Sequence, residues 1–181
     1  MHQTPYVHRM FRDVFTGIDT RQKKAIPINE LHTLLNEDPQ SDKLRRTQAI
    51  ANLLFLFCGM PFVDLAYLEK SNLEGNMLKY NRAKTGIPMN VEILDSAATI
   101  ISQLRNKHTT VLPEHPDYLF YILSGKNKRS DEAGYKEYQS ALRCFNNDLK
   151  SLARKLCIRS SVTSYTFRHK WEYHKNNTIN I

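Results

Sequence analysis

The stretch "KLRRTQAIANLLFLFCGM", residues 43–60, carries apolar side chains at the spacing of one face of an α-helix. Gly59 stands where such a helix commonly ends, because glycine adopts the left-handed backbone conformation without a steric penalty. The sequence therefore predicts a core helix that ends near Gly59. Its expected buried residues are Leu44, Ile50, Leu53, Leu54 and Phe57.

Four further helices are predicted from hydrophobic periodicity, at residues 28–37, 62–73, 95–106 and 135–158. In the first, Asn29 is the expected N-cap. Its expected apolar stripe is Ile28, Leu31, Leu34 and Leu35. A last helix is expected to start after a cap at Thr163 or Ser164, with Tyr165 and Arg168 on one face.

The helix at residues 135–158 is the most basic of these. Its expected buried stripe is Tyr138, Leu142, Phe145, Leu149, Leu152 and Leu156. The basic residues fall mainly outside that stripe: Lys136, Arg143, Lys150, Arg154 and Lys155.

Residues 76–94 change to a strand-like composition around Thr85 and Gly86, which predicts a β-hairpin. Residues 112–134 contain one short apolar run followed by a polar loop. The predicted fold class is therefore mainly α, with a small antiparallel β-hairpin or sheet on one side.

Composition limits the class of protein. The chain has 181 residues, of which 41% are hydrophobic, and this length fits a single domain with a core of its own. Its apolar segments are too short and too interrupted by charge to span a bilayer, and the N-terminus lacks a secretory apolar segment, so a cytoplasmic location is expected. Cys58, Cys144 and Cys157 lack zinc-binding spacing, and each is expected to be a small buried hydrophobe.

The net charge of +8 is unevenly distributed. Residues 136–181 carry nine Lys and Arg against three Asp and Glu, whereas residues 31–135 carry twelve of each. A basic sector on a neutral body is typical of proteins that bind a polyanion such as double-stranded DNA. A solvated helix face is the other interpretation of the same charges.

Four features in this order resemble one known family. They are the helix that ends in "FCGMPFVDLAYLEKSNL", the hairpin with Lys84 in "RAKTG", the basic helix, and "TSYTFRHKW" at residues 163–171. Together they resemble the catalytic domain of tyrosine-type site-specific recombinases, the phage integrase family, and most closely those of mobile elements. The resemblance runs from about Arg9 to Trp171. It implies DNA integration and recombination by strand cleavage and rejoining, with no metal and no cofactor.

The resemblance also implies roles for individual residues. Lys84 matches the hairpin lysine, the expected general acid, and Arg168 and His169 match the adjacent arginine and histidine that hold the phosphate. These three are the expected catalytic residues. Asp64 matches the acidic position that supports the site. Expected contacts to DNA phosphate come from Tyr165, Arg82, Arg143, Lys150 and Arg154.

Three positions depart from the family pattern. Pro61 stands where the first arginine is expected and offers neither charge nor donor, and Arg82 is a candidate to compensate. Tyr165 stands in place of the first histidine of the box. Residues 172–181, "EYHKNNTINI", do not match the segment that carries the nucleophilic tyrosine, so no nucleophile is assigned.

These matches suggest a recombinase catalytic domain cut at both ends: residues 1–25 as the remnant of a linker after a core-binding domain, and residues 26–181 as a C-terminally truncated catalytic domain. Three interpretations stay open. The first is a recombinase-family enzyme domain that is expected to be inactive alone. The second is a noncatalytic DNA-binding or regulatory remnant that occupies recombination sites, or pairs with an intact recombinase protomer, without cutting. The third is a nonfunctional fragment of a decayed mobile element.

Each site residue also has a purely structural interpretation. Lys84 would solvate the end of a hairpin, Arg168 would pair with a carboxylate such as Asp64, and His169 would be a hydrogen-bonded core histidine. Trp171 is expected to pack in the core. Because all the candidates occur in the family order, the sequence favours the functional interpretation for Lys84, Arg168 and His169.

Overall fold

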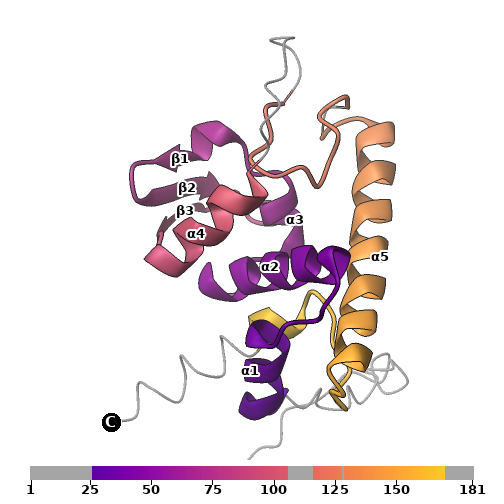
Figure 1. The fold of residues 1–181 in the computed structure, drawn as a ribbon. Coiled ribbons are helices and arrows are strands. Elements are labelled where there is room, and N and C mark those ends of the chain that lie inside the picture. The colour runs from indigo at the N-terminus through magenta and orange to yellow at the C-terminus, as the bar shows by residue number, and fades with distance from the viewer. Residues whose placement is uncertain (1–25, 106–115, 128, 170–181) are drawn as a thin grey trace, which may run out of the picture.

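The computed structural model of the chain describes residues 26–105, 116–127 and 129–169. Helix α2 (Asp42–Leu56) lies at its centre and contacts α1 (Ile28–Asn36), α4 (Asp95–Leu104) and α5 (Glu132–Lys155) (Figure 1). Leu53 and Leu54 of α2 are fully buried, as is Phe57 just after it. The predicted core helix is therefore confirmed.

The turn after α2 sets the direction of the next helix. Cys58 and Gly59 both adopt positive φ, 59° and 70°, which ends α2 and leads the chain into α3 (Phe62–Ala66). Phe62 is buried and stacks on Phe145 of α5, with ring centroids 4.7 Å apart. This aromatic contact fixes α3 against α5, and α3 in turn carries Asp64.

The helix predicted at residues 62–73 is wrong in its length. Helix α3 ends at Ala66, a 3₁₀ turn follows at η2 (Lys70–Asn72), and a two-residue strand, β1 (Leu73–Glu74), completes the segment. Within η2, the backbone N–H of Glu69 donates to Asn72 Oδ1 at 2.7 Å. This local side-chain bond favours a tight turn over continuation of the α-helix.

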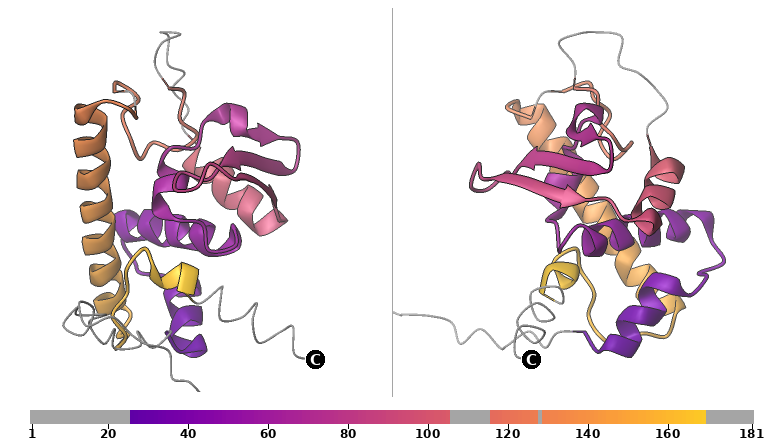
Figure 2. Two further views of the ribbon diagram at one scale, coloured as in Figure 1. Left: turned by 180° about the vertical axis from the view of Figure 1, so that it is seen from behind. Right: turned by 90° about the vertical axis from the view of Figure 1, so that its left-hand side faces the viewer.

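The sheet has three antiparallel strands in the order β1–β2–β3, and β2 (Met77–Asn81) and β3 (Pro88–Glu92) form the predicted hairpin (Figure 2). Leu78 pairs with Val91 and both are buried, whereas the next pair, Lys79 and Asn90, is exposed. This alternation is that of a sheet with one face on the core and one in solvent. The mainly helical fold with a small antiparallel sheet confirms the predicted fold class.

Helix α5 buries Phe145, Leu149, Leu152 and Ala153 and extends along one side of the molecule (Figures 1 and 2). The predicted stripe is confirmed at its centre, while Tyr138, Leu142 and Leu156 are only partly buried. The helix also begins at Glu132, earlier than the predicted residue 135.

Two predictions for α1 are wrong. The helix begins at Ile28 with Pro27 at the N-cap, so Asn29 lies inside the first turn, and Ile28 is 57% exposed. Proline suits this place because its fixed φ is compatible with a helix start and its carbonyl still accepts a bond, here from the N–H of Leu31 at 3.0 Å. Leu31 and Leu34 are buried as predicted.

The apolar run after residue 115 enters the core. Tyr118, Leu119 and Phe120 are buried, and the N–H of Leu119 donates to the carbonyl of Leu68 at 2.7 Å. This bond fixes the run beside the segment that follows α3. The polar loop that continues from it to α5 carries Arg129.

The prediction that the three cysteines are buried is wrong. Cys58, Cys144 and Cys157 are all exposed. Cys58 and Cys157 lie in turns after α2 and α5, with φ of 59° and 55°, so the chain reversal places them at the surface. Of the helices in the described ranges, none is long and apolar enough to cross a membrane.

Candidate nucleic-acid interface

A buried carboxylate, Asp64 of α3, lies at the centre of the predicted site. Asp64 is only 4% exposed, and its Oδ1 accepts the backbone N–H of Ala83 at 2.9 Å. Its Oδ2 is buried and accepts no hydrogen bond from any described residue. The bond from Ala83 joins α3 to the hairpin turn, and Lys84 is the next residue along that turn.

The hairpin turn has a defined backbone. The N–H of Arg82 donates to the carbonyl of Ile87 at 2.9 Å, and the N–H of Gly86 donates to the carbonyl of Arg82 at 2.8 Å. Gly86 has φ of 68°, a conformation that other residues rarely adopt. Lys84 is exposed on this turn, so its ammonium group is accessible to a ligand.

Three arginines from separate segments act on Asp64. Burial raises the pKa of this carboxyl above its ordinary value of 3.8, while the hydrogen bond from Ala83 and the charges of Arg82, Arg129 and Arg168 partly lower it. The arginines come from the hairpin, the loop before α5 and the segment after α5. Tertiary structure thus concentrates positive charge around a single buried carboxylate.

Tyr80 of β2 belongs to the same cluster. Burial and the nearby charge of Asp64 raise the pKa of its phenol to about 12, against the opposing charges of Arg82 and Arg168. Tyr80 therefore stays a neutral phenol at physiological pH. The charge of Arg168 thus lowers the pKa values of both Tyr80 and Asp64.

The segment that carries Arg168 is anchored by its neighbours. Val162 is 1% exposed and Phe167 is fully buried, and the N–H of Ser164 donates to Asn146 Oδ1 of α5 at 2.8 Å. Arg168 follows Phe167 directly and is half-buried. Burial of Phe167 thus holds Arg168 in place.

The predicted cap of this last helical turn is wrong. Among the described residues, no hydrogen bond runs to the side chain of Thr163 or Ser164. Instead, the Thr166 hydroxyl accepts the N–H of Thr163 at 3.0 Å, while the N–H of Thr166 donates to the carbonyl of Thr163 at 2.9 Å. The capping side chain therefore lies inside the turn rather than at its start.

Tyr165 and His169 pack on each other one helical turn apart. Their ring centroids are 4.4 Å apart in an edge-to-face arrangement, and Tyr165 is 53% exposed. Such a contact orients the half-buried imidazole without blocking the phenol. The predicted phosphate contacts of Tyr165 and His169 stay predictions.

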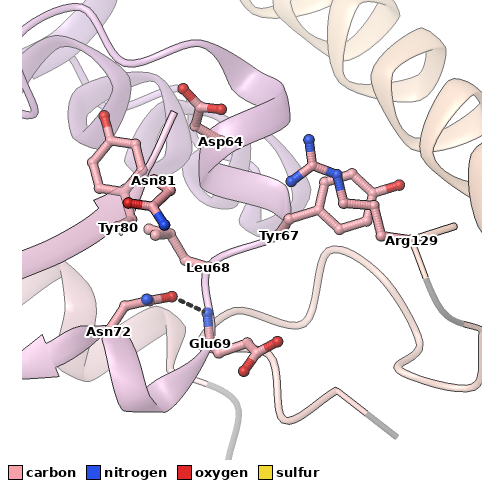
Figure 3. A pocket seen from close by; sticks show the side chains of 8 residues that line it. All are labelled: Asp64, Tyr67, Leu68, Glu69, Asn72, Tyr80, Asn81 and Arg129. Carbon is pink, nitrogen blue, oxygen red and sulfur yellow. Dashed lines mark hydrogen bonds between the residues drawn. The ribbon is translucent and has the colours of Figure 1, made fainter. Parts of the chain in front are cut away.

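Beside Asp64 is a polar cavity of about 230 Å³. The guanidinium of Arg129 lies over the ring of Tyr67, with its carbon 4.8 Å from the ring centroid (Figure 3). No role was predicted for Arg129 from the sequence. The only sequence signal for Arg129 is that it belongs to the basic run "KNKR", residues 126–129. The cavity is lined by Asp64, Tyr67, Leu68, Glu69, Asn72, Tyr80, Asn81 and Arg129.

The structure places the other predicted phosphate contacts apart from this cluster. Arg143, Lys150 and Arg154 are exposed on α5. At about 100° per residue they share a stripe opposite the buried Phe145 and Leu149, so they point away from the core. Their contact with DNA stays a prediction.

Two further predictions concern metal and the end of the chain. Within the ranges that the structure describes, no three His, Cys, Asp or Glu side chains gather as metal ligands would. Trp171 and the segment expected to lack a nucleophile lie outside the described residues, as do residues 1–25.

Comparison with known proteins shows a likeness in fold. No protein-family model matches the chain, and no curated protein matches it in sequence. Its structure is similar to the crystal structure of XerA recombinase, with a TM-score of 0.59 and 19% sequence identity. The match covers 92% of this chain and 54% of that one, so the chain spans about half the length of the recombinase. The two proteins share a fold, which in this chain is a set of helices with a small antiparallel sheet on one side.

Proposed function

We propose that the chain is a DNA-binding domain of the tyrosine recombinase type, which holds the phosphate backbone of duplex DNA at the surface around Asp64. The observation that carries the proposal is the bond from Ala83 to Asp64, which joins α3 to the turn that presents Lys84, at a carboxyl group whose pKa the charges of Arg82, Arg129 and Arg168 lower. The shared fold with a recombinase supports it independently.

Each residue has a role that its chemistry suits. Arg168 would grip two non-bridging phosphate oxygens with its planar fork of donors, and His169 would donate a further hydrogen bond. Lys84, on an exposed turn, would deliver a proton to the leaving 5′-oxygen during strand cleavage. Asp64 supports the site, because its bond to Ala83 fixes the position of that turn.

The proposal extends from DNA binding to strand cleavage and rejoining, the reaction of DNA integration. Pro61 at the N-cap of α3 favours a noncatalytic form for this polypeptide acting alone, because proline contributes no charge to the transition state. In this form the domain occupies DNA without cutting it. The partner we propose for the chemistry is an intact recombinase protomer.

Fluorescence anisotropy with labelled duplex DNA, at several salt concentrations, tests the proposal. We expect nonspecific dissociation constants of about 10⁻⁴ to 10⁻⁶ M at physiological salt and a steep loss of affinity as salt rises. The double variant Lys84→Ala with Arg168→Ala should reduce the slope of log K against log salt by about 1.8, because each phosphate contact contributes about 0.9.

The matched control removes one arginine and one lysine that are paired with carboxylates. Arg45 lies 3.0 Å from Asp38 and Lys136 lies 2.6 Å from Glu132, so the double variant Arg45→Ala with Lys136→Ala should leave the slope nearly unchanged. Equal slopes in both double variants, or affinity in the wild type that does not depend on salt, would show that the proposal is wrong.

A further inference from the structure

Arg129 is held by an aromatic platform rather than by an acid. Its guanidinium carbon lies 4.8 Å from the centroid of Tyr67, and no carboxylate of the described residues forms an ion pair with it. A ring beneath a guanidinium covers one face and leaves the N–H donors at its edge open. Arg129 is exposed, so those donors are accessible from solvent.

The platform itself is fixed on several sides. The ring of Tyr67 lies 5.9 Å from that of Tyr118 and 5.7 Å from that of Tyr138, and its hydroxyl donates to the carbonyl of Gly134 at 3.5 Å. The contacts come from the run before the polar loop and from the first turns of α5. A rigid ring reduces the entropy that Arg129 loses when it binds a ligand.

The cavity next to Arg129 is also lined by an acid, whose unpaired oxygen is buried. Asp64 lines the cavity together with Arg129, and Asp64 Oδ2 is buried without a hydrogen bond from the described residues. The lining also includes a second acid, Glu69, which Figure 3 shows below Leu68, whereas Asp64 lies above it. Arg129 is the one basic residue of this lining, and its charge, like those of Arg82 and Arg168, lowers the pKa of Asp64.

We propose that Arg129 is a phosphate-binding residue, which takes a DNA phosphate at the mouth of the cavity between α3, the hairpin and the start of α5. The inference rests on the proposed function, because it assigns a further residue to the same DNA-binding surface. It also supplies a further guanidinium to the surface around Asp64 in a chain that has Pro61 where the family resemblance leads one to expect an arginine.

The test compares three single variants by DNA anisotropy over a range of salt. Arg129→Gln removes the charge and keeps most of the side-chain length, Arg129→Lys keeps the charge, and Arg45→Ala is the matched control. Arg45 is also exposed, but it is paired with Asp38 and Asp42 near the start of α2, about 17 Å along that helix from its end near the site.

We expect Arg129→Gln to lower the salt slope by about 0.9, so that its loss of affinity relative to wild type is about threefold greater at 50 mM than at 200 mM salt. Arg129→Lys should keep the slope, and Arg45→Ala should not change it. Urea unfolding of each variant checks that the fold is kept, and a midpoint for Arg129→Gln near that of wild type is expected because Arg129 is exposed.

Two results would overturn the inference in distinguishable ways. If Lys84→Ala with Arg168→Ala lowers the slope but Arg129→Gln behaves like Arg45→Ala, then Arg129 does not bind phosphate while the proposed function stands. If the wild-type protein does not bind duplex DNA in a salt-dependent manner, both the proposed function and this inference are wrong.

Discussion

Substitution of Phe167 tests whether burial of one side chain holds the phosphate-binding segment in place. Phe167 is fully buried and lies between Thr166 and Arg168 in a short helical turn. Phe167→Ala removes the ring but leaves every polar group of the site. We expect the segment to lose its main attachment to the core, so that Arg168 no longer acts together with Lys84.

The expected loss of stability in Phe167→Ala follows from the apolar area of the ring that is buried in the folded protein. A phenylalanine side chain buries about 150 to 250 Å², which at about 25 cal/mol per Å² gives about 4 to 6 kcal/mol as an upper bound. Truncation of buried phenylalanine typically costs about 3 to 5 kcal/mol, and we expect Phe167→Ala to fall in this range. Tyr165→Ala, an aromatic truncation two residues away at a site that is 53% exposed, should cost less than about 1 kcal/mol.

Urea denaturation followed by circular dichroism measures both variants. A lower midpoint with an unchanged m-value for Phe167→Ala shows that the segment belongs to the cooperative core. Under conditions where this variant is still folded, its affinity for duplex DNA should fall toward that of Arg168→Ala. A loss of stability for Phe167→Ala no larger than that for Tyr165→Ala would refute the reasoning, because it would mean that the ring does not anchor the segment.

Two other predictions concern Asp64 and catalysis. Because burial raises the pKa of Asp64, the folded state binds the proton of this carboxyl more tightly than the unfolded chain does. The stability of wild type relative to Asp64→Asn should therefore fall as pH rises from about 3.8 through the pKa of the folded state. Urea titrations at several pH values measure this difference. A stability of wild type relative to Asp64→Asn that rises with pH would contradict this prediction. The polypeptide alone should form no covalent adduct with nicked duplex DNA on a denaturing gel, since Pro61 stands where the family resemblance implies a transition-state cation and the accessible Tyr165 shares a helical turn with Arg168. A shifted band that disappears in Tyr165→Phe would contradict this prediction.

Local patterns in the sequence were sufficient for the main elements. The apolar spacing in residues 43–60 predicted α2, and the stripe around Phe145 and Leu149 predicted α5, because a helix that packs on a core must repeat its apolar residues every three or four positions. The hairpin followed from strand composition on both sides of Gly86, whose positive φ the turn requires. These signals lie within a few residues of the structure that they specify.

Short-range competition caused the errors in element boundaries. Pro27 rather than Asn29 is the N-cap of α1, and the bond from Glu69 to Asn72 replaced helix by a 3₁₀ turn. Cys58 and Cys157 are exposed because both lie in left-handed turns that end helices. Hydrophobicity alone does not distinguish such turn positions from core positions.

Tertiary structure alone decided which charges meet. The sequence named Asp64, Arg82 and Arg168 as candidates through a family resemblance, but it assigned nothing to Arg129. Residues 64, 82, 129 and 168 are far apart in the chain, and the effect of the three arginines on the pKa of Asp64 depends on the packing of α3 on α5, the bond from Ala83 to Asp64 and the burial of Phe167. No local periodicity encodes such contacts, because each is fixed by the way separate elements share one core.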